Sequence, residues 1–146
     1  MAANTPAQLY EHIVTNAHEA IIYADRDGAI QLWNAGAESM FGYSAEEALG
    51  KSLDLIVPDR QRQRHWEGYE KVMATGETRY GKELLAVPAL RKDGTRISLE
   101  FSIVLVRDTV GSPLGIAAIM REVTARRQHE KALHERIAAL EANVKT

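Results

Sequence analysis

Alternation of apolar and polar residues predicts strands in the second half of the chain. Over residues 96–106 every second side chain is apolar, and these side chains are Ile97, Leu99, Phe101, Ile103 and Leu105. A period of two is typical of an antiparallel strand that buries one face. Further strands are expected over 77–90 and 114–123, with turns at 91–94 and 108–113.

The first half of the chain predicts a hairpin. Residues 20–24 and 29–33 are apolar enough for two short strands, and they flank Asp25-Arg26-Asp27-Gly28. Glycine accepts a positive φ, so this tetrapeptide suits a tight turn.

Two short helices are expected after the hairpin. The first starts at Asn34 or Ala35, runs through Phe41 and ends at Gly42. The second runs over 44–49, where Ser44 and Glu47 have the spacing of a capping box.

The longest helix expected within the domain covers residues 59–75. Pro58 precedes it, Asp59 is expected to cap its start, and Gly76 is expected to end it. The side chains at helical spacing on its inward face are His65, Trp66, Tyr69, Val72 and Met73.

A helix is expected at each end of the chain. Residues 5–16 carry Leu9 and Ile13 on one stripe, which favours either a dimer contact or packing on the chain's own sheet. Residues 124–145 form a polar helix whose apolar residues follow a 4-3-4 spacing at Leu133, Ile137, Leu140 and Val144. That spacing is typical of a short coiled coil, so these residues and the stripe of the first helix are predicted as a dimer interface.

Composition narrows the function further. The chain has 146 residues, a net charge of −2 and no cysteine. The charge balance does not favour nucleic acid or acidic lipid, and the missing thiols exclude disulfides, thiolate metal sites and cysteine nucleophiles. We find no apolar run of membrane-spanning length and no secretion signal, so we expect a cytoplasmic location.

The order of elements predicts an α+β domain in which helices cover one face of an antiparallel sheet. We divide the chain into a helical cap over residues 1–17, a central domain over 18–124 and a connector helix over 125–146, which has the pattern of a coiled coil.

Four segments in order resemble the PAS family of the sensory-box type. They are Trp33-Asn34-Ala35-Gly36-Ala37-Glu38-Ser39-Met40-Phe41-Gly42-Tyr43, Met73-Ala74-Thr75-Gly76-Glu77, Arg91-Lys92-Asp93-Gly94 and Arg121-Glu122-Val123-Thr124. The sequence departs from the family at Glu122, where Asp is usual. The resemblance implies a five-stranded antiparallel sheet in the order 2-1-5-4-3, a pocket between this sheet and the helix at 59–75, and signalling through the terminal helices.

Catalytic motifs are missing from the sequence. HExxH, GxSxG and GxxxxGK[ST] do not occur. His134-Glu135-Arg136 is followed by Ile-Ala-Ala, whereas a histidine-kinase phosphoacceptor box would continue with Thr-Pro-Leu. We therefore expect no enzymatic activity.

His65 is the candidate metal ligand, as the proximal ligand of heme iron. It matches the position at which similar heme-binding PAS domains of oxygen-sensing kinases carry this ligand, and a neutral imidazole suits heme iron. Those sensors also use a strand arginine near bound oxygen, where this chain has Leu84 and Leu85. A histidine at this position is also common in similar domains that bind no heme. His65 is therefore either a heme ligand or a residue without a cofactor.

Three cofactor states are therefore considered: heme, a non-covalent flavin, and a small organic ligand or none. A flavin–thiol adduct is excluded because the chain has no cysteine. The predicted pocket residues are His65, Trp66, Tyr69, Val72, Met73, Leu84, Phe101, Ile103 and Met120.

The sequence thus predicts a sensory or regulatory PAS domain in two-component or transcriptional signalling. It would sense a small ligand or mediate a protein interaction and pass the signal through its terminal helices. Its expected partners are a second copy, a small-molecule ligand and a downstream output domain or protein, but neither nucleic acid nor a membrane. The alternatives are a heme-based gas or redox sensor and a ligand-free dimerisation module.

Overall fold

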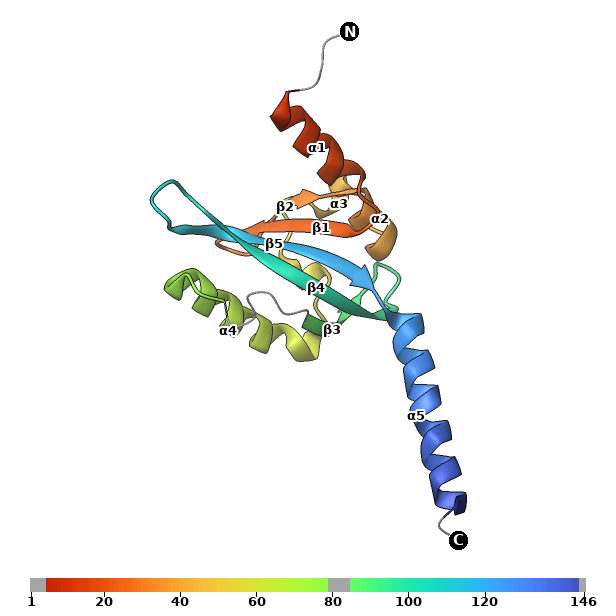
Figure 1. The fold of residues 1–146 in the computed structure, drawn as a ribbon. Helices are drawn as coiled ribbons and strands as arrows, with labels where there is room; N and C mark the ends of the chain where they lie inside the picture. The colour runs from red at the N-terminus through yellow and green to blue at the C-terminus, as the bar shows by residue number, and fades with distance from the viewer. Residues whose placement is uncertain (1–4, 79–84, 145–146) are drawn as a thin grey trace.

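The computed structural model describes residues 5–78 and 85–144, whose strands form one sheet flanked by helices (Figure 1). The helices are α1 (Pro6–Asn16), α2 (Ala35–Phe41), α3 (Ala45–Ala48), the 3-10 helix η1 (Leu53–Leu55), α4 (Asp59–Thr75) and α5 (Thr124–Val144). The strands are β1 (Ala20–Asp25), β2 (Ile30–Trp33), β3 (Leu85–Leu90), β4 (Arg96–Arg107) and β5 (Pro113–Glu122). In Figure 1, α4 runs along one side of the sheet, whereas α1 and α5 extend away from it.

The sheet is antiparallel throughout and has the order β2-β1-β5-β4-β3. The α+β class and the strand order implied by the family resemblance are therefore confirmed. Strand β5 is central, and its ladder with β4 runs from Leu99 opposite Glu122 to Arg107 opposite Pro113. The strand that leads into α5 is thus held on both sides.

The hydrophobic core lies between one face of the sheet and the helices. On β1, alternate residues are buried, as the two-residue period of a strand requires. The largest fully buried side chains are Phe41, Ile22, Ile30 and Leu99. Each large apolar side chain that leaves water contributes about 1.5–3 kcal/mol, so this core holds α2, α3 and α4 on the sheet without disulfides.

The hairpin turn forms where the sequence predicts it. Gly28 has a φ of 78°, and Asp25 Oδ1 accepts hydrogen bonds from the backbone N–H groups of Asp27 and Ala29, at 3.0 Å each. A Cβ atom on Gly28 would overlap the Trp66 indole. The glycine therefore also allows α4 to lie close against the turn.

Two local predictions are wrong. Asp59 does not cap α4, because Pro58 holds the N-cap position, and Asp59 lies inside the first turn, where its carboxylate pairs with Arg62 at 2.9 Å. The third strand does not begin at Glu77, which lies just after α4 and outside any strand. Gly76 ends α4 in the left-handed conformation, and Arg107 donates a hydrogen bond to the Gly76 carbonyl oxygen. Residues 79–84 lie outside the described residues.

The terminal helices form over almost the ranges that the sequence predicts. Thr5 and Gln8 make a capping box at the start of α1. Neither α1 nor α5 buries any residue. Within residues 5–78 and 85–144, no helix combines the length and the apolar composition that a membrane span requires.

Candidate ligand-binding site

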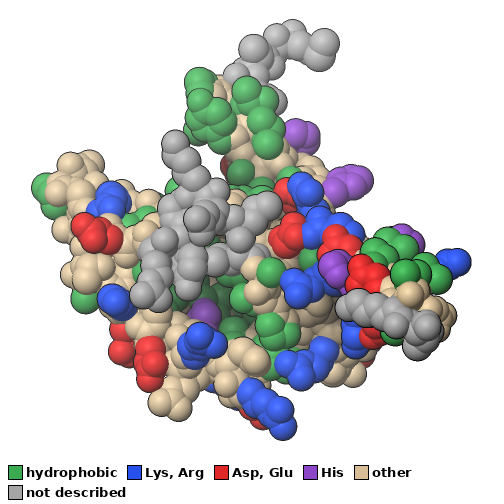
Figure 2. All heavy atoms as spheres, turned by 60° about the horizontal axis from the view of Figure 1, so that its bottom comes forward, with side chains coloured by type: hydrophobic (Ala, Val, Ile, Leu, Met, Phe, Trp, Pro, Cys, Tyr) green, Lys and Arg blue, Asp and Glu red, His purple; other side chains and the backbone are tan. Residues whose placement is uncertain are grey.

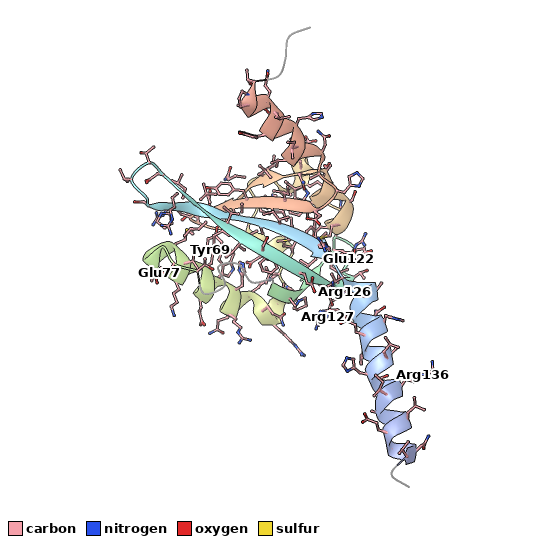
Figure 3. The ribbon with its side chains drawn as sticks, viewed as in Figure 1. Tyr69, Glu77, Glu122, Arg126, Arg127 and Arg136 are labelled. Carbon is pink, nitrogen blue, oxygen red and sulfur yellow. The ribbon has the colours of Figure 1, made fainter. Side chains whose placement is uncertain are left out.

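The face of α4 that packs on the sheet is anchored by Tyr69. This side chain is buried, and its hydroxyl donates to the carbonyl oxygens of Ala24 (3.1 Å) and Asp25 (2.5 Å) at the end of β1. Burial, reinforced by the negative charge of Asp25, raises the pKa of Tyr69 well above its ordinary value of 10.0. The phenol therefore stays protonated, and it ties α4 to the sheet (Figure 3).

His65 lies one turn before Tyr69 and is half-buried. Its Nδ1 atom is buried and has no hydrogen-bond partner among the described residues. Loss of water contact lowers the pKa of His65 below 6.5, and the charge of Asp54 opposes this only in part. The imidazole is therefore neutral at neutral pH, and its ring lies 4.6 Å from the Trp66 ring and 5.9 Å from the Tyr69 ring, centroid to centroid.

Gln61, which sequence reasoning missed, lies one turn before His65. Its Oε1 atom is also buried and without a hydrogen-bond partner among the described residues. Residues four apart lie on one helix face, so the spacing to His65 could have revealed it. A buried polar atom left without a hydrogen bond costs about 1–3 kcal/mol, and such an atom calls for an explanation such as a water molecule or a ligand.

The charged groups next to this pair are already engaged. Trp66 Nε1 donates to Asp54 Oδ1 at 2.7 Å. Arg62 lies 3.8 Å from the Asp54 carboxylate and 2.9 Å from that of Asp59. The polar atoms that remain unpaired on this face of α4 are thus the uncharged ones of Gln61 and His65.

The other predicted pocket residues mostly meet in the core. Met73 and Met120 are buried, Val72 and Phe101 pack against the core, and Phe101 lies opposite Met120 across the β4–β5 ladder. Ile103 is half-buried and stands outside that group. Leu84 lies outside the described residues. Among those residues, no group of three or more His, Asp or Glu side chains is placed to hold a metal ion.

A second feature missed from the sequence is the buried amide of Asn34, which is only 3% exposed. Its Nδ2 donates to the carbonyl oxygens of Val14 (2.8 Å), Glu19 (3.0 Å) and Ala17 (3.4 Å). Its Oδ1 accepts from the backbone N–H groups of Ile21 and Ala37, at 2.8 and 2.9 Å. One side chain therefore joins the end of α1, strand β1 and helix α2.

The start of α5 is held differently. Thr124 Oγ1 accepts from the Ser98 N–H at 3.0 Å, and Ser98 O accepts from the Val123 N–H at 2.8 Å. Arg126 pairs with Glu100 on β4 and, at 3.6 Å, with Glu130 one turn further along α5. Figure 3 shows Arg126 and Arg127 where β5 passes into α5.

The predicted dimer residues are all exposed. Leu9 and Ile13 on α1 are 47% and 56% exposed. On α5 the four residues of the predicted interface are also exposed, namely Leu133, Ile137, Leu140 and Val144.

Residues 14–128 match the family model described as PAS fold. The chain is 34% identical over 121 residues to an uncharacterized protein of Azorhizobium caulinodans, covering 82% of this chain and 16% of that protein. It is 29% identical over 117 residues to the sensor protein FixL of Bradyrhizobium diazoefficiens, covering 80% and 23%. It is also 29% identical over 136 residues to the signal transduction histidine-protein kinase AtoS of Escherichia coli, covering 90% and 21%. The chain thus spans about a fifth of the length of these relatives.

Among solved structures, the crystal structure of a PAS domain from Colwellia psychrerythraea superposes with a TM-score of 0.73. It is 22% identical in sequence, and the match covers 83% of this chain and 99% of that domain. This likeness concerns the fold.

Proposed function

The chain belongs to the family of PAS-fold domains, and we propose that it is a sensory domain of a signalling protein. The matches to proteins named as a sensor and as a signal transduction kinase support a signalling role. In this proposal a small ligand binds beside His65, on the side of α4 that faces the sheet, and α5 carries the response.

The pair of unpartnered atoms on α4 is the observation that carries the proposal. Gln61 Oε1 and His65 Nδ1 are buried one turn apart without hydrogen bonds in the described chain. A ligand that offers an N–H or O–H group to this pair recovers the hydrogen bonds lost on burial. Because the imidazole is neutral and Arg62 is held by two carboxylates, we expect the ligand to be uncharged at this end.

The proposed route to α5 runs through the sheet. A shift of α4 acts on the Tyr69 hydroxyl, which holds the end of β1. Strand β1 pairs along its length with β5, from Ala20 opposite Met120 to Asp25 opposite Gly115. Strand β5 continues into α5, so a change in the sheet reorients that helix.

The first test is native mass spectrometry together with an absorption spectrum of the freshly purified protein. We expect a mass above that of the chain alone, and the difference is the mass of the bound ligand. This added mass should be missing in H65L and in Q61L and should remain in H18L and in Q63L. His18 and Gln63 are exposed residues of the same types, so they are matched controls. A protein with no added mass, whose thermal unfolding does not respond to heme, flavin or neutral heterocycles, would contradict a ligand at this site and favour a ligand-free dimerisation module.

Heme is the second candidate function of the same site, with His65 as the iron ligand. A half-buried, neutral imidazole on an inward helix face suits heme iron as a donor, and heme would supply a binding position for a diatomic gas. The absorption spectrum distinguishes the cases. A Soret band that H65A removes supports heme, whereas a pair of flavin bands supports the non-covalent flavin.

We also propose that the protein acts as a homodimer through its exposed terminal helices. In the heptad pattern of α5, Leu133 and Leu140 occupy position d and Ile137 occupies position a. This assignment places Arg136 at position g and Glu141 at the following position e. Residues at g and e of neighbouring helices form ion pairs in parallel coiled coils. The charges of α5 therefore favour a parallel second copy.

A further inference from the structure

An open groove lies where α5 leaves the sheet. Its volume is about 580 Å³, and it runs between the β3–β4 edge and the first turns of α5. Pro88 and Ile97 contribute to its floor, which is half-buried to buried, whereas Arg96, Arg127 and Lys131 form exposed walls. Figure 2 views the molecule from the side towards which α5 extends, and Lys and Arg side chains gather on this face.

Three cations line this groove without a carboxylate partner in the described chain. Arg96, Arg127 and Lys131 form no ion pair with any residue of the described chain. Glu130, the carboxylate of the groove, lies 3.6 Å from Arg126, which is itself paired with Glu100. Lys92 pairs with Glu47 and Arg121 with Glu19, whereas Arg60 and Arg64 on α4 form no ion pair in the described chain. The groove is distinguished because three unpaired cations from two elements line one surface.

The fold adds to the positive potential of the groove. The first turn of α5 lines it through Thr124, and the start of a helix carries a partial positive charge. Guanidinium groups such as those of Arg96 and Arg127 match the geometry of carboxylates and bind them in pairs of hydrogen bonds. Pro88, which is half-buried, offers a contact for a neighbouring non-polar side chain.

We propose that this groove binds an acidic peptide segment of a partner protein. A small free anion fits less well, because small-molecule sites bury about 70–90% of their ligand, and these walls are exposed. A single exposed ion pair contributes only about 0–1 kcal/mol, so a partner needs several carboxylates placed along one segment. Nucleic acid is disfavoured because the chain has a net charge of −2.

The groove lies at the junction of the sheet and α5, so a bound segment affects the angle between them. A segment that bridges Arg96 on β4 and Lys131 on α5 holds the helix at one angle to the sheet. This part of the inference rests on the proposed function, because it assumes that α5 carries the signal. Binding of the segment itself does not depend on a ligand at His65.

The test uses a short fluorescein-labelled peptide of glutamate and leucine, and a matched peptide in which glutamine replaces glutamate. We expect fluorescence anisotropy to show binding of the acidic peptide alone, and R96Q/R127Q to weaken it by at least about tenfold. The matched control is R60Q/R64Q, which removes the same charge from exposed positions on α4. This control should change the dissociation constant less than about twofold.

Four outcomes would overturn the inference. The first is equal binding of the acidic and the glutamine peptide, and the second is an equal loss of affinity in both double variants. The third is displacement of the acidic peptide by low millimolar inorganic phosphate. The fourth is self-association that R96Q/R127Q abolishes, with no binding of either peptide. The last would assign the groove to a second copy. R96Q/R127Q should leave the mass bound at His65 unchanged, so failure here is separable from failure of the proposed ligand site.

Discussion

The helices α1 and α5 are both exposed, yet they are attached to the sheet in opposite ways. The end of α1 is joined to β1 and α2 through the single buried amide of Asn34, whose donors and acceptor are all used. The start of α5 is held by the Thr124 hydroxyl and by Arg126, whose side chain is 47% exposed. Buried and fully paired polar groups fix a structure, whereas exposed ion pairs contribute little and are screened by salt.

This difference indicates which helix can change its angle. Movement of α1 requires breaking a buried network, with unpaired backbone groups left behind. Movement of α5 about Val123 requires breaking the exposed Arg126 ion pairs and the half-buried Thr124–Ser98 hydrogen bond, while the Val123–Ser98 backbone bond stays in place. We therefore expect α1 to stay fixed to the sheet and α5 to respond, and the following predictions test this contrast.

The largest effect is expected from N34A. It leaves the backbone N–H groups of Ile21 and Ala37 without their acceptor, so we expect a loss of about 4 kcal/mol in the free energy of unfolding, measured by urea denaturation. N16A removes an exposed amide from α1 and should cost no more than about 0.5 kcal/mol. Equal losses would show that the buried amide has no special role.

The next effect concerns the apolar residues of α5. Alanine at Leu133, Ile137 and Leu140 should weaken self-association by at least about a hundredfold in analytical ultracentrifugation, because each buried leucine or isoleucine contributes about 1.5–3 kcal/mol. Alanine at the exposed residues Leu49, Val110 and Leu114 is the control and should leave association unchanged. An unchanged dimer in the first variant would contradict the proposed interface.

A smaller effect is expected from T124V at the start of α5. The substitution removes the acceptor of the Ser98 N–H, so we expect a loss of about 1 kcal/mol and faster hydrogen exchange in the first turn of α5. T15V on exposed α1 is the control. Unchanged exchange in T124V would mean that this hydroxyl does not hold the helix.

The smallest effect is a pH dependence at His65. Its pKa is lowered in the folded state, so the unfolded chain binds the proton more tightly. The contribution to stability is therefore complete above pH 6.5, the ordinary value, and is lost as the pH falls from there through the lower pKa of the folded state. H65N should flatten the decline of stability below pH 6.5, and H18N should not; identical pH profiles for wild type and H65N would contradict a buried neutral imidazole.

Much of the fold could be predicted from local patterns. The two-residue period of β4, the turn at 25–28 and the capping box at Ser44 and Glu47 all appear where the sequence places them. Strand order could not be predicted from periodicity, because no local signal says which strands pair. It came from the family resemblance instead.

The polar features of the structure were harder to predict. Gln61 lies among arginines and resembles a residue of a solvated face, and its burial depends on how α4 sits on the sheet. Four of the five hydrogen bonds of the Asn34 side chain reach residues 13 to 20 positions away in sequence. The basic groove joins Arg96 and Arg127 from separate elements, so only the folded chain brings their charges together.

The direct passage from β5 into α5 makes the helix a lever. Val123 is the one residue between the strand and the helix, and its N–H is bonded to Ser98 O on the neighbouring strand. The 21 residues of α5 extend about 30 Å at 1.5 Å per residue. A tilt of about five degrees at this pivot displaces Val144 by about 3 Å, so a sub-ångström adjustment in the central strand is amplified several-fold at the far end of the helix.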